Sequence, residues 1–182
     1  MALQLALILP IPLRNTYTAV AGETIILKTV PVDPYNWLQG YYQILSYETI
    51  SEQEEVAKLE GGEFLENAYR DRRPLYLVFA QVPIETPTPQ GGSIDWQPVR
   101  VSQSQPDIAD NELFIKGYAE GRSIRYNLER YYMPEALRDE LNATIADLRR
   151  QDPKAVKVEV KVDRFGRAVA VALLMDNQRF KF

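Results

Sequence analysis

The fold of this chain is decided by one stretch near its C-terminus, Val156-Lys157-Val158-Glu159-Val160-Lys161-Val162-Asp163-Arg164-Phe165-Gly166. The valines alternate with charged residues, so in a strand they share one face while the charged side chains share the other. The segment Asp163–Gly166 supplies turn-forming residues, and a second apolar run follows from Ala168 to Met175. We therefore predict an antiparallel hairpin with one buried face and with its turn at Asp163–Gly166.

Comparable patterns predict strands along most of the chain, since apolar and polar residues alternate there. The connection Glu120-Gly121-Arg122 suits a hairpin turn, whereas the Pro- and Gly-containing segment Pro83–Pro98 predicts an extended loop. The predicted fold class is α+β and β-dominated, with mostly antiparallel sheets. Besides the C-terminal hairpin, the predicted strands are Thr24–Val30, Gln43–Tyr47, Leu75–Phe79, Pro98–Ser102, Glu112–Ala119, Ser123–Tyr132 and a short closing strand, Arg179–Phe182.

Helix signals are fewer than strand signals. One amphipathic helix is predicted after Pro134, which suits a first helical position. A capping-box pattern, Ser51 with Glu54, predicts a short helix that ends at Gly61, and a further helical turn is predicted within Glu63–Arg70. We thus expect one clear amphipathic helix and one or two short helices. The apolar stripe of the long helix consists of Leu137, Leu141, Ile145 and Leu148.

The composition indicates a folded chain without Cys or His chemistry. A hydrophobic content of 46% over 182 residues supports one domain with a sizeable core, or two small lobes. The absence of both Cys and His excludes thiolate nucleophiles, imidazole bases and the usual zinc sites. A net charge of −4 without a basic stripe argues against a nucleic-acid surface. The sequence therefore predicts no catalytic residue set, no cofactor and no metal site.

A segment after the first predicted strand resembles a family signature. The Pro31-Val32-Asp33-Pro34 turn is followed by residues at the fixed spacing of the GDYxxLxY motif, with Tyr41 at the position of the Asp. The motif positions are Gly40, Tyr41, Tyr42, Leu45 and Tyr47. Three later blocks are also similar to this family and occur in the same order: Phe114–Gly117, Tyr126–Glu135 and Val156–Asp176. The resemblance implies a bacterial protein anchored by one N-terminal membrane helix, in a family with no assigned activity.

The N-terminal residues 1–14 form an apolar segment that ends at Arg14. The run Ala2–Leu13 is shorter than the roughly 20 residues that a spanning helix needs, and no basic region precedes it. We interpret it as a remnant of the family's anchor, with a buried first strand or a packed arm as the alternative. Residues 15–182 then form a single β-rich domain or two small lobes. The resemblance implies that this domain lies at the membrane, on its extracytoplasmic side.

Carboxylates form one group of candidate functional residues. Asp33 could be a ligand or a catalytic carboxylate, but we favour a rigid corner because Asp and Pro are turn formers. Glu129 and Glu135 could divide acid and base roles between them. We favour structural roles here too, since Glu135 suits a helix start and Glu129 could pair with Arg125 or Arg130.

Aromatic residues form the second candidate group, which could build a stacking platform or an interfacial belt. We favour core positions for Trp37, Tyr42 and Tyr47, because aromatics are common in strands, and an exposed position for Tyr41. The remaining motif residues are interpreted as a corner that needs φ > 0 and as a packed side chain: Gly40 and Leu45.

The predicted function is an interaction or scaffolding module for a membrane protein partner, with the N-terminal segment at the membrane. Two other classes stay open. A small-ligand-binding module would use the aromatic group, and a carboxylate-dependent hydrolase or transferase would use Asp33, Glu129 or Glu135. We do not favour the enzyme, since no companion motif such as a Gly-rich phosphate loop accompanies these carboxylates.

Overall fold

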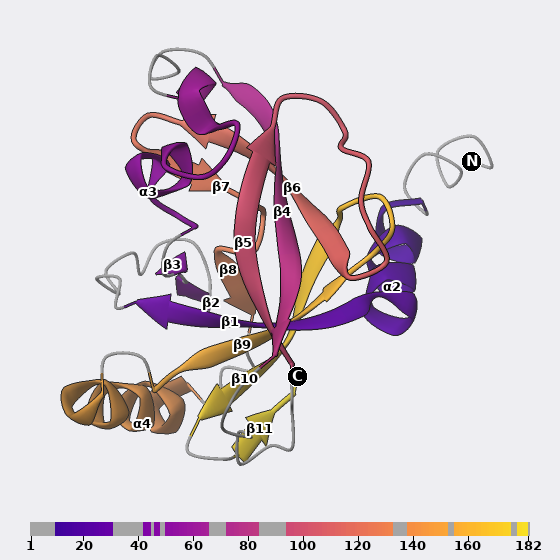
Figure 1. Cartoon of the computed structure of the whole chain (residues 1–182). Coiled ribbons are helices and arrows are strands. Elements are labelled where there is room, and N and C mark those ends of the chain that lie inside the picture. The colour runs from indigo at the N-terminus through magenta and orange to yellow at the C-terminus, as the bar shows by residue number, and fades with distance from the viewer. Residues whose placement is uncertain are drawn as a thin grey trace.

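The computed structural model describes residues 10–30, 42–44, 46–47, 50–65, 72–83, 94–132, 138–152, 155–175 and 178–181. These residues form a β-dominated α+β fold, as predicted, with two antiparallel sheets packed against each other (Figure 1). A small two-stranded ladder stands beside them.

The first sheet contains the hairpin that the sequence predicts. Its strand order is β11-β10-β9-β1, and β3 pairs with the last two residues of β1. The turn lies at Asp163–Gly166, where the Gly166 N–H donates to the Asp163 carbonyl, so the predicted hairpin is confirmed. The strands are β1 (Glu23–Val30), β3 (Ser46–Tyr47), β9 (Lys157–Val162), β10 (Ala168–Met175) and β11 (Gln178–Phe180).

The second sheet has the order β5-β4-β6-β7. The predicted hairpin turn at Glu120-Gly121-Arg122 is confirmed, and Gly121 has a φ of 64°. The strands are β4 (Arg73–Pro83), β5 (Ile94–Ser102), β6 (Glu112–Glu120) and β7 (Ser123–Arg125), and the separate ladder joins β2 (Tyr42–Ile44) to β8 (Arg130–Tyr132).

Two strand predictions are wrong in their extent. The predicted strand Ser123–Tyr132 is broken between β7 and β8, because Asn127 adopts a φ of 61° and the Tyr126 N–H donates to the Glu129 carboxylate. Likewise, β5 begins at Ile94, within the predicted loop. An edge strand tolerates Pro98, since the ladder to β4 has a register shift at this point and Pro98 has no N–H to pair.

The predicted strand Gln43–Tyr47 is divided between two sheets. Its first part belongs to β2, which pairs with β8, whereas its last part is β3, which pairs with β1. The chain leaves β3 through a turn in which the Ser51 N–H donates to the Tyr47 carbonyl.

The long C-terminal helix α4 (Arg138–Gln151) is confirmed. Ile145 of the predicted stripe is buried and packs with Val156 and Met175, and Leu148 packs against the same cluster. The side chains of the other two members of the stripe, Leu137 and Leu141, lie outside the described part of the chain.

The capping box at Ser51 is wrong. Ser51 does not cap α3 (Gln53–Ala57), because its hydroxyl accepts the Tyr47 N–H (2.8 Å) and so closes the turn after β3. The predicted helical turn within Glu63–Arg70 corresponds at its start to the 3-10 helix η1 (Gly62–Leu65), while residues 66–70 lie outside the described segments.

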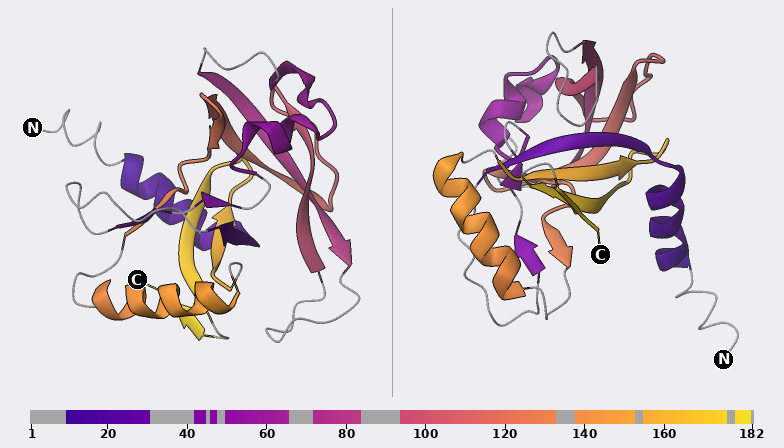
Figure 2. Two further views of the ribbon diagram at one scale, coloured as in Figure 1. Left: turned by 90° about the vertical axis from the view of Figure 1, so that its left-hand side faces the viewer. Right: turned by 90° about the horizontal axis from the view of Figure 1, so that it is seen from below.

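The helix α2 (Pro10–Ala21) crosses the boundary that the sequence suggested at residue 14. It is held against the first sheet by the Thr18 hydroxyl, which donates to the Asp163 carboxylate (2.7 Å), and by Gly22, whose lack of a side chain allows close contact with Val162. Figure 2 shows α2 and α4 at opposite ends of this sheet. Among the described helices, none has both the length and the apolar character needed to cross a bilayer.

The core lies between the two sheets. The alternation of β9 places its valines inward, where they meet apolar side chains of β4 and β6. One cluster therefore joins both sheets; its members include Ile25, Leu27, Val158, Val160, Leu77, Phe79 and Ile115.

Candidate functional site

Among the sequence-predicted site residues, Tyr42, Tyr47 and Glu129 belong to the described part of the chain. For Tyr42 the structure describes the backbone, which pairs with Tyr132 in the ladder of β2 and β8. The others lie outside the described residues: Asp33, Trp37, Gly40, Tyr41, Leu45 and Glu135.

Tyr47 is a core residue and does not belong to an exposed aromatic platform. Its side chain is 1% exposed, and its hydroxyl donates to the Leu128 carbonyl (2.7 Å). Burial, with a smaller contribution from the negative charge of Glu129, raises the pKa of Tyr47 far above its usual value. A buried neutral phenol bound to a carbonyl stabilises the fold, so Tyr47 has the structural role that we favoured.

Glu129 stabilises the turn after β7 through a hydrogen bond to the backbone. Its carboxylate accepts the Tyr126 N–H (2.6 Å), while Arg125 lies beside Glu120 (3.6 Å). Of the two predicted partners of Glu129, Arg125 lies beside Glu120 instead, and the side chain of Arg130 lies outside the described residues; the contact that the structure describes for Glu129 is the one to the Tyr126 backbone. Tyr126 in turn donates its hydroxyl to the Ile50 carbonyl (2.9 Å), which ties this corner to the chain after β3.

A cleft of about 500 Å³ opens where β5 passes close to β1, beside α3. This volume is within the range of about 300–1,000 Å³ that is usual for ligand sites. Its floor and walls combine apolar and charged side chains from both sheets and from the α3 region. The residues that line the cleft include Ile26, Lys28, Ile50, Leu59, Phe79, Asp95, Trp96, Gln97 and Pro98.

Two groups in the cleft have polar atoms without a partner among the described residues. The Lys28 ammonium lies in an exposed position of β1 and has no ion pair there. The Trp96 ring is partly buried, and its indole N–H makes no hydrogen bond to the described chain. By contrast, Lys58 is already occupied, because its ammonium donates to the Glu55 carboxylate (2.5 Å), which raises the pKa of Lys58.

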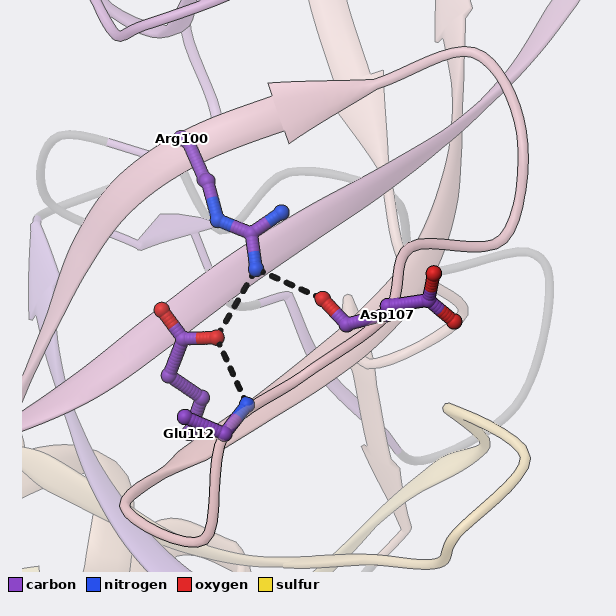
Figure 3. A network of polar contacts seen from close by, with 4 residues as sticks. Arg100, Asp107 and Glu112 are labelled. Atoms are coloured by element: carbon purple, nitrogen blue, oxygen red, sulfur yellow. Dashed lines mark hydrogen bonds and ion pairs between the residues drawn. The ribbon is translucent and has the colours of Figure 1, made fainter.

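A second cavity of about 330 Å³ also borders Trp96. It reaches Ile108 and Glu112, and the loop between β5 and β6 is held by Arg100. The Arg100 guanidinium donates to the Glu112 carboxylate (2.8 Å) and to the Asp107 carbonyl (2.9 Å), as Figure 3 shows. These bonds keep the loop in place, and the bond from Arg100 lowers the pKa of Glu112.

The described residues contain no group of three or more acidic side chains that could hold a metal ion. Asp163, although buried, is fully used: its carboxylate accepts from Thr18 and from the backbone N–H groups of Phe165 and Arg167. The candidate site among the described residues is the cleft that Lys28 and Trp96 line.

Sequence reasoning missed this cleft. Trp96 fell within the predicted loop, and Lys28 and Leu59 belong to segments that meet Trp96 only in the folded chain. The one available signal was the pattern Ile94-Asp95-Trp96-Gln97, whose alternation is hidden by the proline that follows it.

Comparisons with known proteins identify the family. Neither the curated proteins nor the solved structures give a significant match. One family model does match, described as GDYXXLXY protein, and it covers residues 4–173. This match includes the motif segment, both sheets up to the later part of β10 and the helices, and so the chain belongs to the GDYXXLXY family.

Proposed function

We propose that this protein is an interaction module that binds a segment of a partner protein in the cleft between β1, α3 and β5, and that it works at a membrane. The observation that carries the proposal is the cleft itself, in which the Lys28 ammonium and the Trp96 indole N–H have no partner among the described residues. Unused polar groups on an apolar wall give a ligand both orientation and contact area.

A polypeptide partner suits this cleft because it is open and bordered by strand edges. Leu59 and Trp96 offer partly buried apolar surface, and Lys28 offers a positive charge. Aromatic anchors of this kind commonly dominate the energy of protein–protein contacts. Of the three carboxylates of the catalytic alternative, Glu129 accepts the Tyr126 N–H, whereas Asp33 and Glu135 lie outside the described residues.

The membrane part of the proposal rests on the sequence. The apolar run Ala2–Leu13 leads into α2, which is fastened to the first sheet by the bond from Thr18 to Asp163. An apolar segment at this position would hold the domain, and with it the cleft, close to a membrane protein partner. The proposal includes an extracytoplasmic position for the domain.

Site-specific photo-crosslinking in cells that express the protein from its native locus tests the proposal. A photoreactive residue at Gln97, which is exposed and lines the cleft, should yield one defined adduct in the membrane fraction. The same residue at Ala143, exposed on α4 and outside the cleft lining, should not. The change Trp96→Ala should suppress the Gln97 adduct.

Equal adducts from both positions would refute binding at the cleft. Recovery of the native product entirely in the soluble fraction under mild salt would refute the membrane part. The two parts of the proposal are therefore tested separately in one set of cells.

A further inference from the structure

Positive charges and aromatic rings gather on the outer face of the second sheet. Leu77 of β4 and Ile115 of β6 belong to the core, so side chains one position away face outward. Tyr76 stands directly opposite Lys116 in the ladder, and Tyr118 follows two positions further along β6. These three side chains therefore share the face that is turned away from the core.

The tyrosine rings of this face hold two cations. The Lys116 ammonium lies 5.4 Å from the centroid of the Tyr76 ring, and the Arg72 guanidinium lies 3.8 Å from the centroid of the Tyr118 ring. Both cations are exposed, and both tyrosines are partly exposed. Because a cation is attracted to the face of a ring, each long side chain has a preferred position at the surface.

The tip of the hairpin between β9 and β10 extends this face. The Phe114 ring packs edge-to-face against the Tyr76 ring, with 5.7 Å between the two centroids. The Gly166 backbone lies against the same Phe114 ring, and the Gly166 carbonyl accepts the Lys116 N–H. Phe165, the neighbour of Gly166, is thus continuous with the outer face of the sheet.

At the tip, an exposed ring stands between two arginines. Phe165 is 41% exposed, and the guanidinium groups of Arg164 and Arg167 lie 4.7 and 5.7 Å from the centroid of its ring. Together with Arg72, Lys116 and their two tyrosines, this tip forms a surface that we call the cationic strip.

The four cations of the strip have no ion pair within the described part of the chain. The carboxylates on this face of β6 are occupied, since Glu112 is bound by Arg100 and Glu120 lies beside Arg125. Glu23 and Asp110 border the second cavity together with Arg164, but neither forms an ion pair with it. The strip is therefore a region of unmatched positive charge on a chain whose net charge is −4.

The strip is also fastened to the helix that follows the apolar N-terminal run. The Thr18 hydroxyl donates to the Asp163 carboxylate at the base of the tip, which places the tip beside α2 (Figure 1). This helix begins at Pro10, within the run Ala2–Leu13, and rises by about 12 Å between Pro10 and Thr18. The tip therefore stays within reach of a membrane that receives the run.

We infer that the cationic strip rests on the membrane surface, where its cations contact anionic lipid headgroups and the Phe165 ring enters the headgroup region. This inference rests on the membrane part of the proposed function and specifies which face of the domain meets the lipid. An exposed ring beside guanidinium groups suits this interface, because the ring leaves water while the charges stay with the phosphates. An acidic protein segment would match the charges alone and would not account for the exposed ring.

The first test measures where the tip lies on a bilayer. The chain has no Cys, so Phe165→Cys in the full chain can carry a single nitrobenzoxadiazole fluorophore. On vesicles of phosphatidylcholine and phosphatidylglycerol, its emission should shift to the blue and be quenched by nitroxide-labelled lipid. The matched control, Ala143→Cys, is exposed on α4, at the opposite end of the first sheet from α2 (Figure 2), and should show neither change.

The second test measures the contribution of the charges. Arg72→Gln, Lys116→Gln and Arg167→Gln should each weaken binding to these vesicles by about fivefold, because a cation near an anionic surface contributes about 1 kcal/mol. Arg150→Gln removes the same charge from α4, outside the strip, and should have little effect. On vesicles of phosphatidylcholine alone, all four variants should bind as weakly as the unchanged chain.

The outcomes separate this inference from the proposed function. Vesicle binding with the label at position 165 still in water would mean that the N-terminal run alone holds the chain, which overturns the role of the strip and leaves the membrane part intact. An equal effect of Arg150→Gln would also overturn it. The cleft takes no part in these measurements, so Trp96→Ala should leave vesicle binding unchanged even though it suppresses the adduct at Gln97.

A soluble polyanion distinguishes lipid from an acidic protein segment. Polyglutamate should compete only weakly with the vesicles, because it offers no layer for the Phe165 ring. Tight binding of polyglutamate that needs Arg72, Lys116 and Arg167, together with a label that stays in water on vesicles, would overturn the lipid contact and assign the strip to an acidic protein.

Discussion

At the scale of single residues, two buried tyrosines fasten the corner between the sheets. Tyr47 donates its hydroxyl to the Leu128 carbonyl, and Tyr126 donates to the Ile50 carbonyl. Each bond links segments that are far apart in the sequence. A tyrosine pair of this kind satisfies two carbonyls in the core, which explains why polar aromatics stand there.

Removing either hydroxyl should destabilise the fold. Tyr47→Phe and Tyr126→Phe each leave a buried carbonyl unpaired, at a cost of about 1–3 kcal/mol in the free energy of unfolding. Urea unfolding followed by circular dichroism measures this. The matched control is Tyr17→Phe on α2, where the side chain is 50% exposed and no loss beyond about 0.5 kcal/mol is expected. Equal effects at all three positions would refute the role of the buried bonds.

At the scale of elements, the tip of the hairpin between β9 and β10 is docked on β6. The Lys116 N–H of β6 donates to the Gly166 carbonyl (2.8 Å), and a Cβ atom at Gly166 would lie 2.4 Å from the Phe114 ring. Glycine is therefore required at position 166 for two reasons: its φ of 75° disfavours other residues, and a side chain would collide with the Phe114 ring.

A comparison of Gly166 with Gly121 separates the effect of positive φ from the effect of the close contact with Phe114. Gly166→Ala and Gly121→Ala both place a side chain at positive φ, at a cost of about 1–2 kcal/mol. At Gly121 a Cβ atom would meet nothing within 4 Å, whereas at Gly166 it would collide with Phe114. Gly166→Ala should therefore be less stable than Gly121→Ala by a further amount of about 1–3 kcal/mol. Thermal unfolding of the two variants would contradict this if their melting temperatures were the same.

At the scale of the whole molecule, stability should fall at both ends of the pH range. Hydrogen bonds from Arg100 and Arg179 lower the pKa values of Glu112 and Glu159 from about 4.5. A lowered pKa means that the stabilisation is present above the unfolded value and is lost as pH falls through the folded value. The loss of stability at low pH should therefore occur below about pH 4.5.

At high pH, stability should fall because the pKa values of two buried tyrosines are raised, in contrast to the lowered pKa values of the glutamates. Burial raises the pKa values of Tyr47 and Tyr126 above the ordinary tyrosine value of 10.0, so their stabilisation is complete below about pH 10 and is lost as pH rises beyond it. Urea titrations across pH should show both limits, and Glu112→Gln should flatten the acid limb. Phenolate absorbance from the buried pair should appear only together with unfolding; its appearance in the folded protein would contradict the prediction.

The sequence predicted those parts of the fold whose pattern is local. The alternation of Val156–Val162 and the stripe containing Ile145 are visible within a few residues, and the hairpin and α4 follow from them. The break at Asn127 and the continuation of β5 through Pro98 depend on pairing with distant strands, which a local pattern does not contain. The cleft was missed for the same reason, because its walls come from segments far apart in the chain.

The lack of free backbone donors on the outward edge of β5 at the cleft also limits how copies of this protein can associate. A growing fibre requires every molecule to offer two edges that accept a strand. At the cleft, β5 does not offer such an edge, because Pro98 has no N–H and the Trp96 N–H is bound by the Asp95 carboxylate. The outward edge of β5 at the cleft is therefore a poor template for the strands of further copies.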